Sequence, residues 1–135
     1  MAYLVDANVL SEAAKPRPNE KVVSWLRANE SEFFVDPVIL GEIDLGILLL
    51  PGGRKRDHLE SWFQTITSRI ECLAWDAAVS RRWARLVADM RRKGRSLPVL
   101  DSMIAATALV HDLTLATHNT RDFKKAGVAV FDPFL

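Results

Sequence analysis

The chain has 135 residues, 18 lysines and arginines against 17 aspartates and glutamates, and a single cysteine, Cys72. This length predicts one domain, spanning residues 1–135, with one hydrophobic core. One cysteine excludes an intrachain disulfide framework and a Cys-based zinc site. A net charge of +1 argues against a protein that holds nucleic acid by overall charge. The longest near-apolar stretch, 46–53, is too short to span a bilayer, and nothing resembles a secretory signal, so we expect a cytoplasmic protein without membrane contact.

Short apolar segments predict five strands, in chain order over residues 3–5, 33–35, 70–73, 113–116 and 128–131. Helical spacing of apolar residues and helix-start signals predict helices over residues 8–13, 20–28, 38–49, 54–67, 76–93, 100–110 and 121–125. Pro37 suits a first helical position, Asp76 an N-cap, and Gly94 a helix stop. Strands that alternate with helices predict an α/β fold, a three-layer α/β/α sandwich around a mainly parallel five-stranded sheet.

Four carboxylates stand in or beside apolar segments: Asp6, Glu42, Asp101 and Asp122. No lysine or arginine lies within three residues of the first three. A buried carboxylate without a partner is costly or loses its charge, so a shared cation is a simple explanation for the set. Taken singly, each has another interpretation. Asp6 and Asp122 suit N-caps, Asp101 suits the first turn of a helix, and Glu42 suits a rim position or a distant ion pair.

Helical spacing places Glu42 on a side of its helix that we expect to be buried, together with Val38, Ile39, Leu45, Gly46 and Leu49. Ligands of parallel sheets bind outside the carboxyl ends of the strands, where Asp6 and Thr117 are expected. Several carboxylates with few soft ligands suit a hard cation such as Mg²⁺.

Four polar residues accompany the carboxylates: Asn8, Ser11, Thr117 and Asn119. They serve either as local turn and capping groups or as groups that orient the carboxylates, water or substrate.

The segments 4–12, 40–43 with Gly46, 98–108 and 117–123 resemble, in this order, the successive motifs of PIN-domain proteins, most closely the VapC-type toxins of bacterial toxin–antitoxin pairs. The resemblance covers essentially the whole chain and implies a ribonuclease that depends on Mg²⁺ or Mn²⁺. Carried over, the acidic quartet is Asp6, Glu42, Asp101 and Asp122, with Asp6 and Asp101 the firmest metal ligands. It also implies a homodimer, inhibition by a cognate VapB-type antitoxin, and DNA binding only through that antitoxin.

The sequence departs from the family pattern at three positions. Ala7 stands where a small hydroxyl residue is common, His118 where arginine is frequent, and Asp36 where serine or threonine is frequent. None removes an acidic ligand, so the departures bear on substrate contacts and pocket polarity. The expected reaction is in-line hydrolysis of an RNA phosphodiester by a metal-activated water, which Glu42 or Asp122 orients. Single-stranded or loop RNA is the expected substrate form.

Three other functions remain open at this point. A metal-free ribonuclease would use His58, His111 or His118 as acid and base. A phosphoacceptor domain also has an acidic pocket on an α/β sheet, although no suitable aspartate ends a middle strand. A non-catalytic interaction module would use the acidic pocket only to dock a basic partner segment.

Two further features are ambiguous in the sequence. Basic residues crowd segments 54–56 and 81–95 and form either solvated surfaces or a rim that binds a phosphate chain. Trp75 and Trp83 serve either to stack RNA bases or, as we favour, to pack in the core or a dimer interface.

Overall fold

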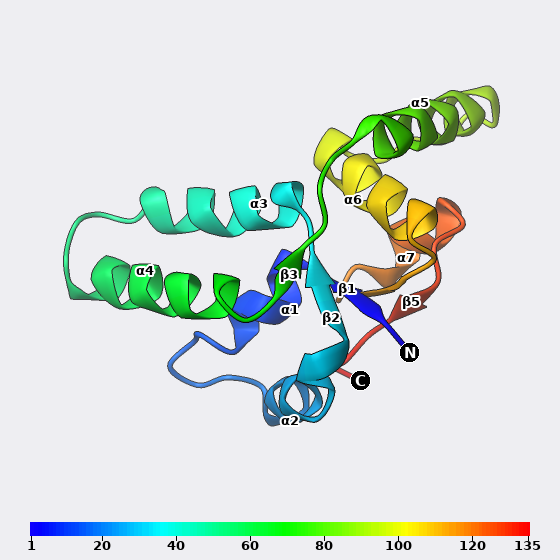
Figure 1. Cartoon of the computed structure of the whole chain (residues 1–135). Coiled ribbons are helices and arrows are strands. Elements are labelled where there is room, and N and C mark those ends of the chain that lie inside the picture. The colour runs from blue at the N-terminus through cyan, green and yellow to red at the C-terminus, as the bar shows by residue number, and fades with distance from the viewer.

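A computed structural model describes all residues, 1–135, and shows a sheet of five parallel strands in the order β3-β2-β1-β4-β5. The strands are β1 (Tyr3–Val5), β2 (Phe33–Val35), β3 (Glu71–Cys72), β4 (Thr114–Ala116) and β5 (Val130–Phe131). The helices are α1 (Ala7–Glu12), α2 (Glu20–Asn29), α3 (Pro37–Leu48), α4 (Arg54–Thr67), α5 (Ala77–Arg92), α6 (Val99–Val110) and α7 (Thr120–Lys125), with a short 3-10 turn at Glu30–Glu32. In Figure 1, α2 lies on one side of the strands, and α5 and α6 lie on the other. The predicted α/β sandwich is confirmed, with a sheet that is parallel throughout.

The predicted elements are all present, with small shifts at their ends. The largest differences fall on the two edge strands, because β3 and β5 are each only two residues long. Both residues of β3 are exposed, and only Ile70 of the predicted segment is buried. An edge strand pairs on one side only, so its sequence carries a weaker signal than a central strand does.

The central strands are buried on both faces, as expected for a parallel sheet between helices. Leu4 and Val5 of β1 and Leu115 of β4 have no accessible surface. On one face an aromatic cluster attaches α2 to the sheet. The ring of Trp25 lies 5.0 Å from both Tyr3 and Phe33, centroid to centroid.

Helix α3 corrects one expectation about Glu42. Its buried row is Ile39, Ile43 and Ile47, which repeats every four residues along the helix. Glu42 therefore lies at the side of the helix and is half-buried, whereas Leu45 and Leu49 are 56% and 76% exposed. The sequence placed Glu42 on a buried stripe because leucines occur on both sides of this helix.

Several helix boundaries follow from single residues. Pro37 begins α3, and the Asp76 carboxylate accepts a hydrogen bond from the Val79 N–H at 3.0 Å as the N-cap of α5, both as predicted. Gly94 follows α5 with φ +67°, a left-handed conformation that favours glycine. No helix of the chain has the length and apolar character needed to cross a membrane.

Sheet topology brings polar residues to one edge. β1 pairs with β2 on one side and with β4 on the other. The strands that follow β1 in the chain are thus added first on one side of it, as β2 and β3, and then on the other, as β4 and β5. Asp6, Asp36 and Thr117 directly follow β1, β2 and β4, at the carboxyl ends of three adjacent strands. This is the position at which open parallel sheets bind ligands.

Candidate active site

Asp6 is the most firmly held carboxylate at this edge. Its side chain is buried, and three groups donate hydrogen bonds to it: the Ala7 N–H at 2.8 Å, the Thr117 hydroxyl at 2.8 Å and the Asn8 amide at 3.2 Å. Burial nevertheless raises its pKa above the ordinary value, because desolvation outweighs these bonds. Asp6 is also the N-cap of α1, so the capping interpretation is confirmed, and the cap lies at the same edge as the candidate site.

The four accompanying polar residues differ in their contacts. The Thr117 hydroxyl is central, since it also accepts hydrogen bonds from the Asn119 N–H at 3.0 Å and from the Asn8 amide at 3.4 Å. The Asn8 carbonyl in turn accepts from the His118 N–H at 3.1 Å. Asn119 thus contributes its backbone to this network. Ser11 lines a neighbouring cavity and makes no hydrogen bond to a carboxylate.

Glu42 and Asp101 reach the same edge from α3 and α6. Burial, followed by the charges of Asp6, Asp101 and Asp36, raises the pKa of Glu42 to about 7. Burial, followed by the charges of Asp6 and Asp122, raises the pKa of Asp101. No hydrogen bond within the protein stabilises the ionised form of either carboxylate. Their oxygens are therefore free to accept a cation or water.

Asp122 lies at the margin of the group. It is half-buried in the first turn of α7, whose N-cap is Asn119, so Asp122 does not cap the helix. Its nearest cation is the ammonium of Lys125, 4.0 Å from its carboxylate, rather than Arg121. Among the four predicted carboxylates its charge acts on the pKa of Asp101 alone.

Asp36 is a fifth carboxylate that the sequence interpretation did not place in the site. It is fully buried, accepts a hydrogen bond from the Ile39 N–H at 2.8 Å, and accepts another from the Thr107 hydroxyl at 2.7 Å. Burial raises its pKa despite these bonds, and the charge of Asp6 raises it further. It ties α3 to α6, the two helices that carry Glu42 and Asp101. One signal was available, since Asp36 follows its strand as directly as Asp6 follows β1.

The chemistry of these donors suits a hard cation. All are carboxylates, and like charges raise the pKa of Asp36, Glu42 and Asp101, a cost that a bound cation relieves. No three His, Cys, Asp or Glu side chains converge closely enough to form a ready cage. Mg²⁺ does not require one, because it is commonly held by one or two carboxylates and completes its octahedron with water and substrate oxygens.

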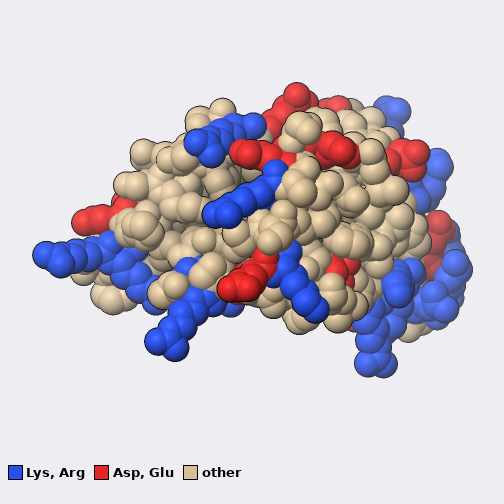
Figure 2. Space-filling model, turned by 90° about the horizontal axis from the view of Figure 1, so that it is seen from below, with Lys and Arg blue, Asp and Glu red and all other residues tan.

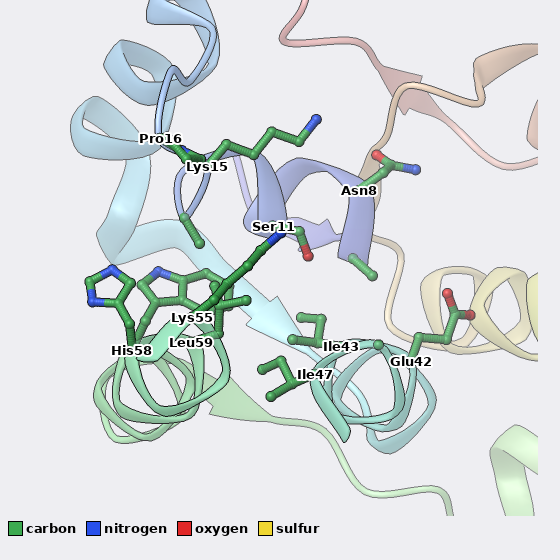
Figure 3. A pocket seen from close by; sticks show the side chains of 14 residues that line it. Asn8, Ser11, Lys15, Pro16, Glu42, Ile43, Ile47, Lys55, His58 and Leu59 are labelled. Carbon is green, nitrogen blue, oxygen red and sulfur yellow. The ribbon is translucent and has the colours of Figure 1, made fainter. Parts of the chain in front are cut away.

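A cavity of about 720 Å³ adjoins the site between α1, α3 and α4. Its apolar wall includes Ile43, Ile47 and Trp62, and Glu42 lies at its border with the acidic group. Figure 3 shows Lys55 extending from α4 toward α1 across this space.

The PIN domain family model matches residues 3–129. The chain belongs to the PIN-domain family. Toxin FitB of Neisseria gonorrhoeae is 36% identical over 137 residues, which cover 97% of both chains. VapC ribonuclease Y4jK of Sinorhizobium fredii is 28% identical and covers 97% of this chain and 96% of its own. The structure of FitAB bound to an IR36 DNA fragment superposes with a TM-score of 0.88 at 33% identity, covering 98% of this chain and 96% of the other.

Proposed function

We propose that this PIN-domain protein is a Mg²⁺-dependent endoribonuclease, with Mn²⁺ as a substitute, and the toxin of a toxin–antitoxin pair. The observation that carries the proposal is that Asp6, Glu42 and Asp101 reach one edge of the sheet from three separate elements and have no basic partner. Burial raises the pKa of all three, and the charge of Asp6 raises the pKa of Glu42 and Asp101 further. A structural ion cluster would include a lysine or arginine. The similarity to a VapC ribonuclease and to a toxin supports the same reaction class.

The contacts of each residue suggest its role in the proposed reaction. When bound, Mg²⁺ supplies Lewis-acid stabilisation of phosphodiester charge and lowers the pKa of water. Asp6 would be the fixed ligand, because Thr117 and Asn8 hold its carboxylate in one orientation. Asp101, whose oxygens accept no hydrogen bond within the protein, would be the second ligand. Glu42, with its pKa near neutrality, is suited to orient the attacking water and accept its proton. The charge of Asp122 acts on this group by raising the pKa of Asp101.

An antitoxin of the VapB or FitA type is the partner that we propose for the cavity beside the site. The apolar wall suits apolar side chains of a partner segment, and the adjacent carboxylates suit a basic one. A segment with both kinds of residue would block the substrate and neutralise the carboxylates together. DNA binding would come through this partner, since FitAB is the complex bound to DNA in the similar structure.

We further infer a homodimer. A groove of about 480 Å³ is lined by Glu42 and Asp101 and by four exposed apolar side chains. Leu45 lies on α3, Leu49 directly follows that helix, and Val99 and Leu100 begin α6. A contiguous apolar surface of this kind suits a symmetric contact between two copies. Leu49→Asp should yield monomers in light scattering, whereas Leu135→Asp, at an even more exposed leucine elsewhere, should leave the dimer intact.

Cleavage of single-stranded RNA by the purified chain tests the proposed reaction. Asp6→Asn should abolish cleavage and leave the circular dichroism spectrum unchanged. Asp44→Asn, a carboxylate on α3 outside the group, is the matched control and should cleave normally. Full activity in excess EDTA, or an unchanged rate in Asp6→Asn, would refute the proposal. Tight binding of a basic peptide by a chain that never cleaves RNA would favour the interaction module.

A further inference from the structure

A second concave surface lies between α5 and α7. It is a hollow of about 370 Å³ whose rim carries five cations, Arg82, Lys93, Arg95, Lys124 and Lys125. Arg82 is half-buried and the other four are exposed. Figure 2 shows Lys and Arg side chains crowded at the right-hand end of the molecule, the end at which α5 and α7 lie in Figure 1. We refer to this surface as the basic hollow.

The basic hollow lies between the body of α5, which contributes Arg82, and the C-terminal ends of α5 and α7. Gly94 after α5 and Gly127 after α7 both adopt positive φ, +67° and +79°. Each turn closes its helix with backbone hydrogen bonds, from the Arg95 N–H to the Met90 carbonyl at 2.8 Å and from the Gly127 N–H to the Lys124 carbonyl at 3.0 Å. These turns bring the cations of the last helical turns and of the following loop around one space.

Helix ends alone do not account for this much charge. Cations in a last turn balance the helix dipole, which amounts to about half a negative charge per helix end, or about one for the two ends. The only acidic residue in the lining, Asp89, is already bonded to Arg92 at 3.1 Å, outside the hollow. Lys125 has a carboxylate partner, Asp122, at 4.0 Å, so the four other cations face about one negative charge from the helix ends. The surplus of positive charge calls for an anionic ligand.

The hollow also adjoins the candidate active site. Helix α7 carries Asp122 in its first turn and Lys124 and Lys125 in its last, so these residues lie within about 5 Å of each other along the helix axis. The ammonium of Lys125 is 4.0 Å from the Asp122 carboxylate. On the other side, the loop with Arg95 leads directly into α6, which carries Asp101. A chain of phosphates that crosses the hollow would thus continue toward the carboxylates.

We propose that the basic hollow binds the phosphate backbone of the RNA strand next to the nucleotides that enter the active site. The identity of the strand as RNA rests on the proposed function. Only Leu86, Met90 and Ala126 provide apolar surface in the lining, so the hollow lacks the apolar anchor that a protein partner would use. Backbone binding is largely independent of sequence, which leaves the choice of cleavage site to other contacts.

The test is binding of a fluorescein-labelled single-stranded RNA to the full chain in EDTA, followed by fluorescence anisotropy over a salt series. The hollow variant combines Lys93→Gln, Arg95→Gln and Lys124→Gln, none of which belongs to the acidic group. The control variant removes the same charge with Arg17→Gln, Lys21→Gln and Arg27→Gln. These three are exposed residues on or before α2, which lies at the opposite side of the molecule (Figure 1).

The hollow variant should bind RNA about 10- to 100-fold more weakly at 0.1 M salt, and the slope of log K against log salt should fall by about two, since each phosphate contact contributes about 0.7. The control should change little. Equal losses in both variants, or no RNA binding by the unmodified chain, would overturn the inference. So would displacement of the RNA by poly-glutamate without displacement by inorganic polyphosphate, because the hollow would then recognise a protein segment. Binding in EDTA needs no cleavage, so a chain that fails to cut RNA still tests the hollow.

Discussion

Replacing Glu42 by glutamine should stabilise the metal-free protein at alkaline pH. The pKa of Glu42 rises from 4.5 to about 7, first through burial and then through the charges of Asp6, Asp101 and Asp36. A folded-state pKa above the unfolded value means that the carboxylate favours folding while it is protonated. This stability is fully present below pH 4.5 and is lost as the pH rises through 7. Glutamine cannot ionise, so the variant keeps that stability at pH 8.

The size of the effect follows from the same pKa. A rise from 4.5 to about 7 corresponds to about 3 kcal/mol at ~1.4 kcal/mol per pH unit. Because Glu42 is only half-buried, solvent screening reduces the expected gain to about 1 kcal/mol. For a domain of this size, 1 kcal/mol raises the melting temperature by about 4 °C.

Urea unfolding in EDTA at pH 5 and pH 8 measures this difference. The unmodified chain should lose about 1 kcal/mol more than Glu42→Gln between the two pH values, and saturating Mn²⁺ should restore most of the loss. A variant that is less stable than the unmodified chain at pH 8 would show that Glu42 forms a favourable interaction there. The account of repelling carboxylates would then be wrong.

Three further substitutions test the surroundings of the site. Asp36→Ala should cost about 2–4 kcal/mol of unfolding free energy, because it leaves a buried hydroxyl and an N–H unpaired. Asp36→Asn should stay within about 1 kcal/mol, because its oxygen still accepts from the Ile39 N–H and its amide can donate to the Thr107 hydroxyl oxygen. Thr117→Val should weaken Mn²⁺ binding by about 10- to 100-fold, since the Asp6 carboxylate loses its orienting hydroxyl; unchanged affinity would contradict that role. Gly127→Ala should cost about 1 kcal/mol through its backbone conformation alone, with Gly52→Ala neutral, because a methyl group added at either position would meet no atom within 4 Å. Urea unfolding of the two glycine variants measures the difference.

The fold was predictable because its signals are local. Short apolar runs such as 3–5 and 113–116 alternate with amphipathic segments, and residues such as Pro37 and Asp76 mark helix starts by their own chemistry. The lengths of the edge strands were overestimated, since a strand of two exposed residues has no pattern to read. All five expected strands are nevertheless present. The helix and turn before each later strand mark where that strand begins, even where the strand itself is short.

The candidate site was predictable only in part. Strand ends identify Asp6 and Thr117, since parallel topology sends all such ends to one edge. Glu42 was singled out for a reason that the structure contradicts, because its helix buries isoleucines on an adjacent face. Asp36 was seen only as a departure from a pattern. Its bond to Thr107, 71 residues away, depends on how α3 meets α6, which no local pattern reveals.

The most direct test of the central claim, that these carboxylates jointly hold a divalent cation, is calorimetric titration of the metal-free chain with Mn²⁺ at pH 7 in two buffers of different ionisation enthalpy. The comparison gives both the affinity and the number of protons released. We predict binding with release of about half a proton, because Glu42 is about half protonated at a pKa of about 7, and loss of binding in Asp101→Asn. Binding that persists unchanged in Asp101→Asn, or no binding by the unmodified chain, would contradict the account.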